Sequence, residues 1–168
     1  MPLLLLCIGD FLAVILVLIA RPTSNVDRSL TPLLLTFFGT FYFWFVDLGP
    51  GLPAIPFSLG ESVQVVGISL QLAAKLWLGR SFGLLPAHRG LVVGGPYRLV
   101  RHPMYLGYFL NHMGYLACAF SVHNAVVYAL LYGVQLGRII TEERVLLGDA
   151  EYAAYAERVR YRFIPFVY

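Results

Sequence analysis

The chain has 168 residues, of which 59% are hydrophobic and 12% are charged, with a formal net charge of +3 and a mean hydropathy of +0.74. Soluble domains carry about 25% charged residues, so this composition excludes a disordered chain and argues against a water-soluble globule. We expect a lipid bilayer as the solvent and, from the length, a single domain over residues 1–168.

Five apolar stretches approach the length of about 20 residues that a membrane-spanning helix needs. In chain order they cover residues 2–20, 32–48, 61–78, 104–120 and 126–140. The fourth and fifth are separated by a short turn, which predicts a helical hairpin. Residues 141–159 are charged, with apolar residues at spacings of three and four, and this pattern predicts an amphipathic helix.

Basic residues occur in alternate connections between these stretches. The first and third connections carry arginines, as does the region after the fifth stretch, whereas the second and fourth connections carry no Lys or Arg. Five membrane-spanning helices require this alternation, because short cytoplasmic loops are enriched in Lys and Arg. The pattern predicts an N-terminus outside and a C-terminus in the cytoplasm, on the same side as residues 79–103.

One cytoplasmic stretch, GGPYRLVRHPMYLGY at residues 94–108, is dense in Gly, Pro, Arg, His and Tyr. Glycines allow a ligand to approach the backbone closely. Pro103 suits the first turn of a helix and so places His102 near the N-cap, where free N–H groups would hold an anionic group. The alternative interpretation is a basic loop that contacts anionic lipid.

Two adjacent carboxylates, Glu142 and Glu143, follow the fifth apolar stretch. Gln135, Arg138 and Glu142 are spaced by three and four residues and therefore share one helix face. A polar face inside an apolar helix is expected to line protein or a cavity rather than lipid. The alternative interpretation is a pair of solvated charges at the membrane boundary.

The motifs GPYR, RHPMYLG and the double glutamate, followed by DAEYAAYAERVRYRFIP, together resemble the isoprenylcysteine carboxyl methyltransferase family, whose relatives include phospholipid methyltransferases. The resemblance covers about residues 71–165, which would form the cofactor-binding part, and Lys75 stands where an arginine is expected. It implies an all-α integral membrane enzyme with S-adenosylmethionine as its cofactor. The chain looks more like bacterial members, which implies a multi-pass protein of the inner membrane.

The resemblance also implies the site residues, by position within the motifs. The catalytic candidates are Arg98, Arg101 and Glu143. The cofactor-binding candidates are Gly95, Pro96, Tyr97, Arg98, His102, Pro103, Tyr105, Gly107, Glu142 and Glu143. The glutamates would balance cationic groups or bind ribose hydroxyls, the arginines would pair with a carboxylate, and the tyrosines would stack or donate a hydroxyl.

The implied reaction moves a methyl group to a lipophilic acceptor: a prenylcysteine-like carboxylate, a lipid amine or a small thiol. We expect the acceptor to enter from the lipid through an opening lined by aromatics such as Phe41, Trp44 or Trp77. Asp10 and His112 lie at similar depths, and we expect them to pair or to line the acceptor cavity.

Two other functions stay open from the sequence. A membrane reductase of the sterol-reductase type, using NADPH, resembles the same RHP–Tyr region, and a non-enzymatic membrane protein would tolerate substitution of Arg101 or Glu142. Lys75 lies about one turn from the end of its apolar stretch, so its amine is expected to reach the interface. The four histidines lack a metal-binding spacing, so neither a metal nor a nucleic acid is an expected partner.

Overall fold

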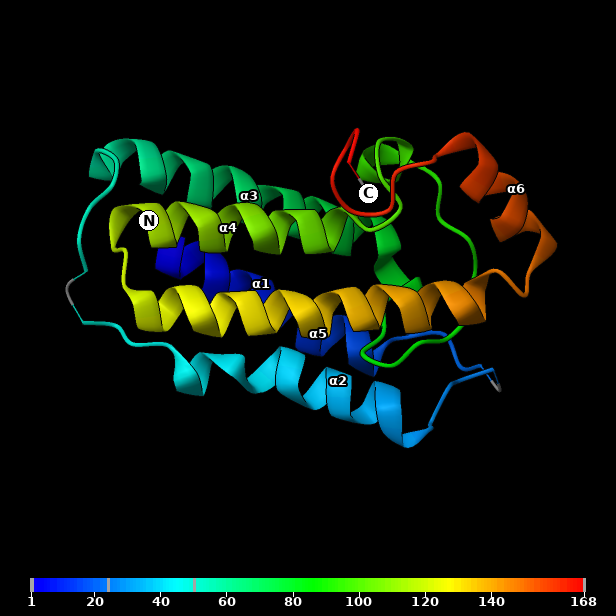
Figure 1. Cartoon of the computed structure of the whole chain (residues 1–168). Coiled ribbons are helices and arrows are strands. Elements are labelled where there is room, and N and C mark those ends of the chain that lie inside the picture. Colours follow the sequence, from blue (N-terminus) through cyan, green and yellow to red (C-terminus); the bar gives the residue numbers. More distant parts are fainter. Residues whose placement is uncertain (1, 24, 50, 168) are drawn as a thin grey trace.

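A computed structural model describes residues 2–23, 25–49 and 51–167, and the regular structure of these residues is helical (Figure 1). The longer helices are α1 (Pro2–Leu18), α2 (Leu30–Phe41), α3 (Phe57–Leu78), α4 (Pro103–Cys118) and α5 (Val122–Leu146), and the short α6 covers Ala150–Arg158. Turns of 3₁₀ helix form η1 (Tyr42–Phe45), η2 (Gly79–Ser81) and η3 (Gly95–Arg98). Extended pairing in the described residues is confined to isolated bridges, so the all-α prediction is confirmed.

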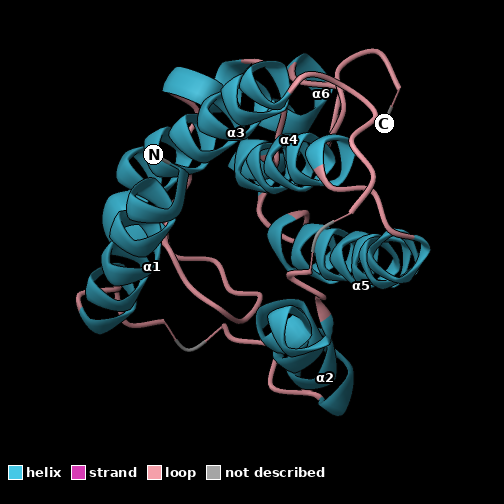
Figure 2. Cartoon of the chain, turned by 90° about the vertical axis from the view of Figure 1, so that its left-hand side faces the viewer, coloured by secondary structure: helices cyan, strands magenta, loops and turns pink. Residues whose placement is uncertain are grey.

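The five longer helices run in alternating directions along one axis (Figure 1). Viewed along that axis, they form an open arc in the order α1, α3, α4, α5, α2 (Figure 2). The connections 19–29 and 79–102 meet at one end, where the Arg21 N–H donates to the Arg80 carbonyl at 2.8 Å. Together with residues 147–167, they form what we call the basic end of the molecule, and both sequence motifs lie there (Figure 1).

The C-terminal helix is shorter than predicted. Residues 141–146 continue α5, and the chain turns at residues 147–149 before α6 begins. Asp149 fixes that start, because its carboxylate accepts the backbone N–H groups of Glu151 at 2.9 Å and Tyr152 at 3.0 Å. A single amphipathic helix over 141–159 was therefore the wrong prediction, since a capping residue in the middle of the segment begins a new helix.

A line of small residues brings α3 and α4 together as an antiparallel pair. Gly60 and Gly67 on α3 are spaced by seven, as are Gly107 and Gly114 on α4, so each pair lies on one helix face. A Cβ atom at Gly67 would lie 2.6 Å from the Asn111 nitrogen and 2.7 Å from the Gly107 oxygen. Because the two backbones are in contact, helix packing depends on glycine here, as is common between helices in membranes.

The outer surface is strongly apolar. On α1, the side chains of Leu4, Phe11 and Leu18 are each about two thirds or more exposed (66%, 69% and 79%). Exposed apolar surface of this extent marks a contact with membrane or protein. Among the described residues, one helix, 57–81, is long and apolar enough on its own to cross a membrane, and the apolar helices at 3–18 and 30–45 are shorter. The five-span arrangement therefore stays a prediction.

Gly67→Ala is expected to destabilise the protein by about 1–3 kcal/mol or more. The added methyl group meets backbone atoms that cannot move aside unless α3 separates from α4. Thermal unfolding in detergent measures the effect. Gly133→Ala is the matched control, since nothing lies within 4 Å of a Cβ there and alanine improves helix propensity. A Gly67→Ala protein as stable as the Gly133→Ala protein contradicts this account of the packing.

Candidate functional site

The GPYR motif forms the turn η3, packed against the end of α3. Gly95 has φ +55°, a conformation that favours glycine, and a Cβ atom there would meet the indole of Trp77. Tyr97 is buried, and its hydroxyl donates to the carbonyl of Ala74 at 3.4 Å. This turn therefore fixes the start of the RHP segment against α3.

The RHP segment begins α4 as predicted, with His102 at the N-cap and Pro103 in the first turn. The predicted free N–H groups are partly used within the protein. The N–H of Arg101 donates to the Tyr161 carbonyl at 2.9 Å, and that of His102 donates to the Arg162 carbonyl at 2.8 Å. The C-terminal segment thus takes up two of the backbone N–H groups at the start of α4.

The carboxylate of Glu143 holds the C-terminal segment to the rest of the basic end. Its carboxylate lies 2.9 Å from Nε of Arg101 and 3.0 Å from Nε2 of His102, accepts the Tyr152 hydroxyl at 2.8 Å, and lies 3.3 Å from Nε of Arg162. The carboxylate is almost fully buried, so these four partners replace its hydration. The four partners come from the RHP segment, α6 and the C-terminal segment, and Glu143 therefore holds these three segments together.

The charges of this cluster support one another. Burial alone would raise the pKa of Glu143, but the hydrogen bond and charge of His102, the Tyr152 hydroxyl and Arg101 outweigh burial and lower that pKa to about 2. Burial alone would lower the pKa of His102, whereas its hydrogen bonds to Glu142 and Glu143 outweigh burial and raise it. The two carboxylates therefore stabilise the imidazolium form of His102 relative to that of an exposed histidine.

Glu142 differs from Glu143 in being accessible. Its carboxylate accepts the hydroxyl of Tyr105 and lies 3.5 Å from Nδ1 of His102. Its side chain is 22% exposed, against 4% for the side chain of Glu143, and the exposed part faces a cavity. Glu142 is thus the carboxylate that a ligand at the basic end can reach.

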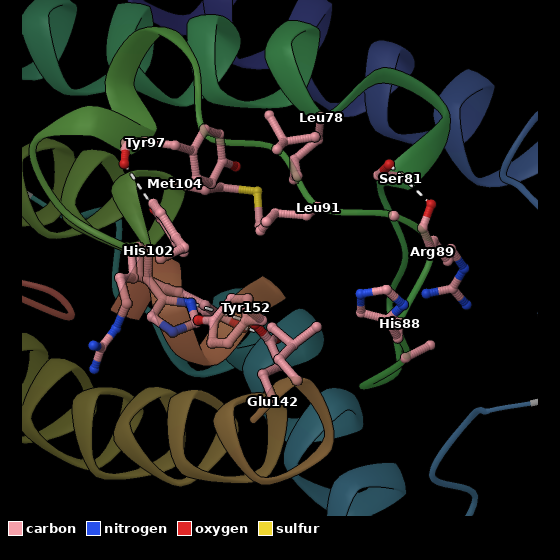
Figure 3. Close-up of a pocket in the computed structure, with 17 residues that line it drawn as sticks. Leu78, Ser81, His88, Arg89, Leu91, Tyr97, His102, Met104, Glu142 and Tyr152 are labelled. Carbon is pink, nitrogen blue, oxygen red and sulfur yellow. Dashed lines mark hydrogen bonds and ion pairs between the residues drawn. The ribbon is translucent and has the colours of Figure 1, made fainter. Parts of the chain in front are cut away.

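This smaller cavity has a volume of about 110 Å³ and lies between η3, the start of α4, the end of α5 and α6 (Figure 3). Its walls combine aromatic, apolar and polar groups. They are formed by Leu78, Ser81, Ala87, His88, Arg89, Gly90, Leu91, Val92, Tyr97, Arg101, His102, Met104, Tyr105, Glu142, Leu146, Tyr152 and Tyr155. Nε2 of His88 is buried and makes no hydrogen bond among the described residues, and the carboxylate of Asp149 lies 3.8 Å from it.

The structure brings most, but not all, of the predicted site residues to this cavity. Those on its wall are Tyr97, Arg101, His102, Tyr105 and Glu142. Glu143 supports the wall from behind, Gly95 and Pro96 shape the turn η3, and Pro103 and Gly107 belong to α4. Arg98 is exposed and does not line this cavity.

Sequence reasoning missed part of the wall. His88 and Leu91 lie in an irregular connection with no motif of its own, and Met104 is an apolar residue inside the RHPMYLG motif. For Met104, the signal in the sequence was its place inside the RHPMYLG motif. Tyr152 and Tyr155 of α6 were not missed, because their spacing on one face of the predicted amphipathic helix marked them as residues that would close over the cofactor.

A larger cavity of about 630 Å³ lies among the longer helices. Asp10 and His112 both line it, as expected, but they do not pair in the described structure. His112 is instead bonded to two tyrosine hydroxyls, with Nε2 2.7 Å from Tyr42 and Nδ1 2.7 Å from Tyr132. These tyrosines satisfy both ring nitrogens, which leaves Asp10 free to interact elsewhere.

One expectation about this part of the molecule was wrong, and another stays a prediction. Lys75 does not reach the interface: it is buried, and its amine donates to the carbonyl of Gly9 at 2.9 Å, because α1 packs across α3 at that point. The aromatics that line the cavity include Tyr42, Phe43 and Tyr108. Phe41, Trp44 and Trp77 lie outside its wall, and both tryptophans are exposed.

Comparison with known proteins bears on what this site does. The sequence profile of the phospholipid methyltransferase family matches residues 54–149, which include both motifs and most of the wall of the smaller cavity. This chain belongs to the phospholipid methyltransferase family. The predicted resemblance to these membrane methyltransferases is confirmed by the match.

Three known proteins are similar to the chain. Protein-S-isoprenylcysteine O-methyltransferase A of Arabidopsis thaliana is 32% identical over 66% of this chain and 59% of its own length. The cobalt-zinc-cadmium resistance protein CzcN of Cupriavidus metallidurans is 33% identical over 58% of the chain and 45% of its own length. The nickel-cobalt-cadmium resistance protein NccN of Alcaligenes xylosoxydans xylosoxydans is 28% identical, over 58% and 46%. The match thus spans about half the length of these relatives.

Glu143→Gln is expected to destabilise the protein by about 3–5 kcal/mol, because it removes the charge that compensates buried Arg101 and His102. Thermal unfolding in detergent measures the loss. Glu157→Gln is the matched control, since Glu157 is exposed on α6. Equal stability of the two variants would show that Glu143 does not hold the basic end together.

The contribution of His102 to stability is expected to depend on pH. Because the pKa of His102 is raised in the folded protein, its contribution is complete below about pH 6.5 and is lost as the pH rises through the folded-state pKa. The melting-temperature difference between the parent and His102→Gln should therefore shrink as the pH is raised from about 6 toward about 9. A difference that stays constant or grows over this range contradicts an imidazolium at this position.

Proposed function

We propose that this chain is an integral membrane methyltransferase that uses S-adenosylmethionine to methylate a lipophilic acceptor at the cytoplasmic face. One observation carries the proposal: Tyr97, His102 and Tyr105 of one motif and Glu142 of a second, distant motif line a single cavity at the basic end. Family membership supplies the reaction class, and the activity named for the Arabidopsis relative is consistent with it.

The proposed topology has five membrane-spanning helices, with the N-terminus outside and the basic end in the cytoplasm. The alternating directions of α1 to α5 (Figure 1) and the exposed apolar side chains support this arrangement. The arginine-rich connections gather at one end, as the distribution of positive charge in membrane proteins requires. A bacterial inner membrane is the proposed location.

The chemistry of the smaller cavity fits this cofactor. The accessible carboxylate of Glu142 suits a cationic group or a pair of hydroxyls, and the imidazole of His88 adds a polar group to the wall. Tyr97 and Tyr152 provide aromatic surface, and Leu91 provides apolar surface for a flat ring. The volume of about 110 Å³ is below the roughly 300–1,000 Å³ usual for such ligands, so residues 82–95, which supply none of the four partners of Glu143 described above, must move outward when the cofactor binds.

Bound S-adenosylmethionine supplies an electrophilic methyl group and leaves as a neutral thioether. The protein contributes position and exclusion of water, which are effective for an in-line displacement whose charge disperses at the transition state. Glu143, fully engaged with its four partners, keeps the RHP segment and α6 in place, so the cofactor meets a preformed wall. A carboxylate acceptor needs no base, whereas an amine or thiol must lose a proton, and Glu142 is the accessible group to receive it.

The purified protein is expected to bind S-adenosylhomocysteine in titration calorimetry, whereas NADPH is not expected to bind. Glu142→Gln should weaken this binding by roughly tenfold or more, because it removes the accessible charge of the cavity, an effect of about 1.4 kcal/mol. Arg144→Gln is the control, since Arg144 is exposed near the end of α5 and does not line the cavity.

Binding should also slow hydrogen exchange in residues 82–95, because this segment must rearrange to contact the cofactor. Binding of NADPH but not S-adenosylhomocysteine would favour the reductase. Binding of neither would favour a non-enzymatic membrane protein, and either result overturns the proposal.

A further inference from the structure

The two cavities adjoin at one side chain. Met104 is the one described residue that lines both the smaller cavity at the basic end and the larger cavity among the helices. It stands in the first turn of α4, and its sulfur points into the smaller cavity toward Leu91 (Figure 3). Met104 therefore forms the partition between the two spaces.

Two helix faces run from one cavity into the other. On α4, Met104, Tyr108 and Asn111 are spaced by four and three residues, share one face, and all line the larger cavity. On α5, Glu142 lines the smaller cavity, while Arg138 and Gln135, one and two turns away, line the larger. A molecule lying along these faces passes from the membrane interior to Glu142, and Met104 lies in its path.

The larger cavity holds polar groups that the protein does not satisfy. Nε2 of Gln71, Oδ1 of Asn111 and Oε1 of Gln135 are buried and have no hydrogen-bond partner among the described residues. Leaving such a group unpaired is costly, so a ligand that bonds them is favoured. On α4, Asn111 lies about two turns, or roughly 10 Å, from the partition.

Much of the rest of the larger cavity is apolar, and Asp10, Lys75 and Arg138 add charged groups to its wall. Its volume of about 630 Å³ is within the usual range for a lipid-sized or drug-sized ligand. Leu3, Leu6, Val14 and Leu18 line it from α1, and Phe43 lines it from η1. The occupant that fits both parts is an amphiphile with a polar head toward Met104 and an apolar tail toward α1.

We propose that Met104 is the specificity-determining partition of the enzyme: the head group of a lipophilic acceptor lies in the larger cavity and reaches the methyl donor only past this side chain. The proposal rests on the proposed function above. Methionine suits the role because its unbranched, flexible side chain adapts to different neighbours. In the reaction, the S–CH₃ bond breaks as an acceptor heteroatom supplies the electron pair of the new bond to carbon, and any proton of a neutral acceptor leaves by way of Glu142.

The first experiment measures whether Met104 faces both ligands, without requiring turnover. In a Cys7→Ala, Cys118→Ala background, Met104→Cys is labelled with N-ethylmaleimide, with Met113→Cys as the control from the same helix. Methylation by the unlabelled parent first selects the acceptor from three probes: an S-prenylated N-acetylcysteine, vesicles containing phosphatidylethanolamine, and a long-chain alkanethiol. Both S-adenosylhomocysteine and the selected probe should slow labelling of Met104→Cys but not of Met113→Cys.

The second experiment separates cofactor binding from acceptor use. Met104→Phe is expected to lower kcat/KM for the selected acceptor by roughly tenfold or more, because the larger ring narrows the passage and misplaces the head group. Met104→Ala should change the order of preference among the acceptors. For Met104→Phe, the fall in kcat/KM for the acceptor should exceed any fall in affinity for S-adenosylhomocysteine by roughly tenfold, and Met113→Phe should retain acceptor turnover.

The two ways in which these experiments can fail are distinct. Protection of Met104→Cys from labelling by one ligand alone, or full acceptor turnover by Met104→Phe, overturns the role of Met104 and leaves the proposed function intact. A parent protein that binds no S-adenosylhomocysteine, or that methylates none of the three probes, overturns the proposed function and the role of Met104 with it.

Discussion

The basic end of this protein depends on one buried carboxylate. Removing Glu143 from water is costly, and the cost is offset only because Arg101, His102, Tyr152 and Arg162 surround it. Apart from α6, the segments that supply these partners contain little regular structure. Their positions follow from the carboxylate: the start of α4, the helix α6 and the C-terminal segment converge because each supplies a group that Glu143 needs. The wall of the smaller cavity is a consequence of this convergence.

The longer helices obey a different constraint. In a bilayer, apolar side chains gain little by leaving lipid for protein, so close packing of backbones has to hold helices together. The glycines of α3 and α4 provide that contact, whereas α1 packs on α3 and α2 on α5 at the two ends of the arc. The helices at the centre of the arc pack closely, and the larger cavity lies on the inner side of the arc. Residues of both α1 and α2 line this cavity.

Much of this arrangement followed from the sequence, because it depends on patterns that extend over many residues. Apolar length located the five longer helices, alternating arginines placed the two motifs at one end, and proline and histidine marked the start of α4. Features set by a single tertiary contact were missed. Lys75 was expected to reach the interface because it lies about one turn from the end of its apolar stretch. Its hydrogen bond to Gly9 depends instead on how α1 crosses α3. Met104 matters only because two cavities meet there.

The double glutamate shows where sequence and structure contribute different information. The motif predicted two carboxylates at the site but did not divide their roles. Adjacent residues on an α-helix point about 100° apart, so two neighbouring side chains cannot face the same cavity equally. Glu143 points toward α6 and the C-terminal segment, where its four partners engage it fully, and Glu142 points toward the smaller cavity, where it stays accessible. His102 lies between them and contacts both. Any change in the charge at Glu142 is therefore felt by the cluster around Glu143, which couples ligand binding to the stability of the basic end.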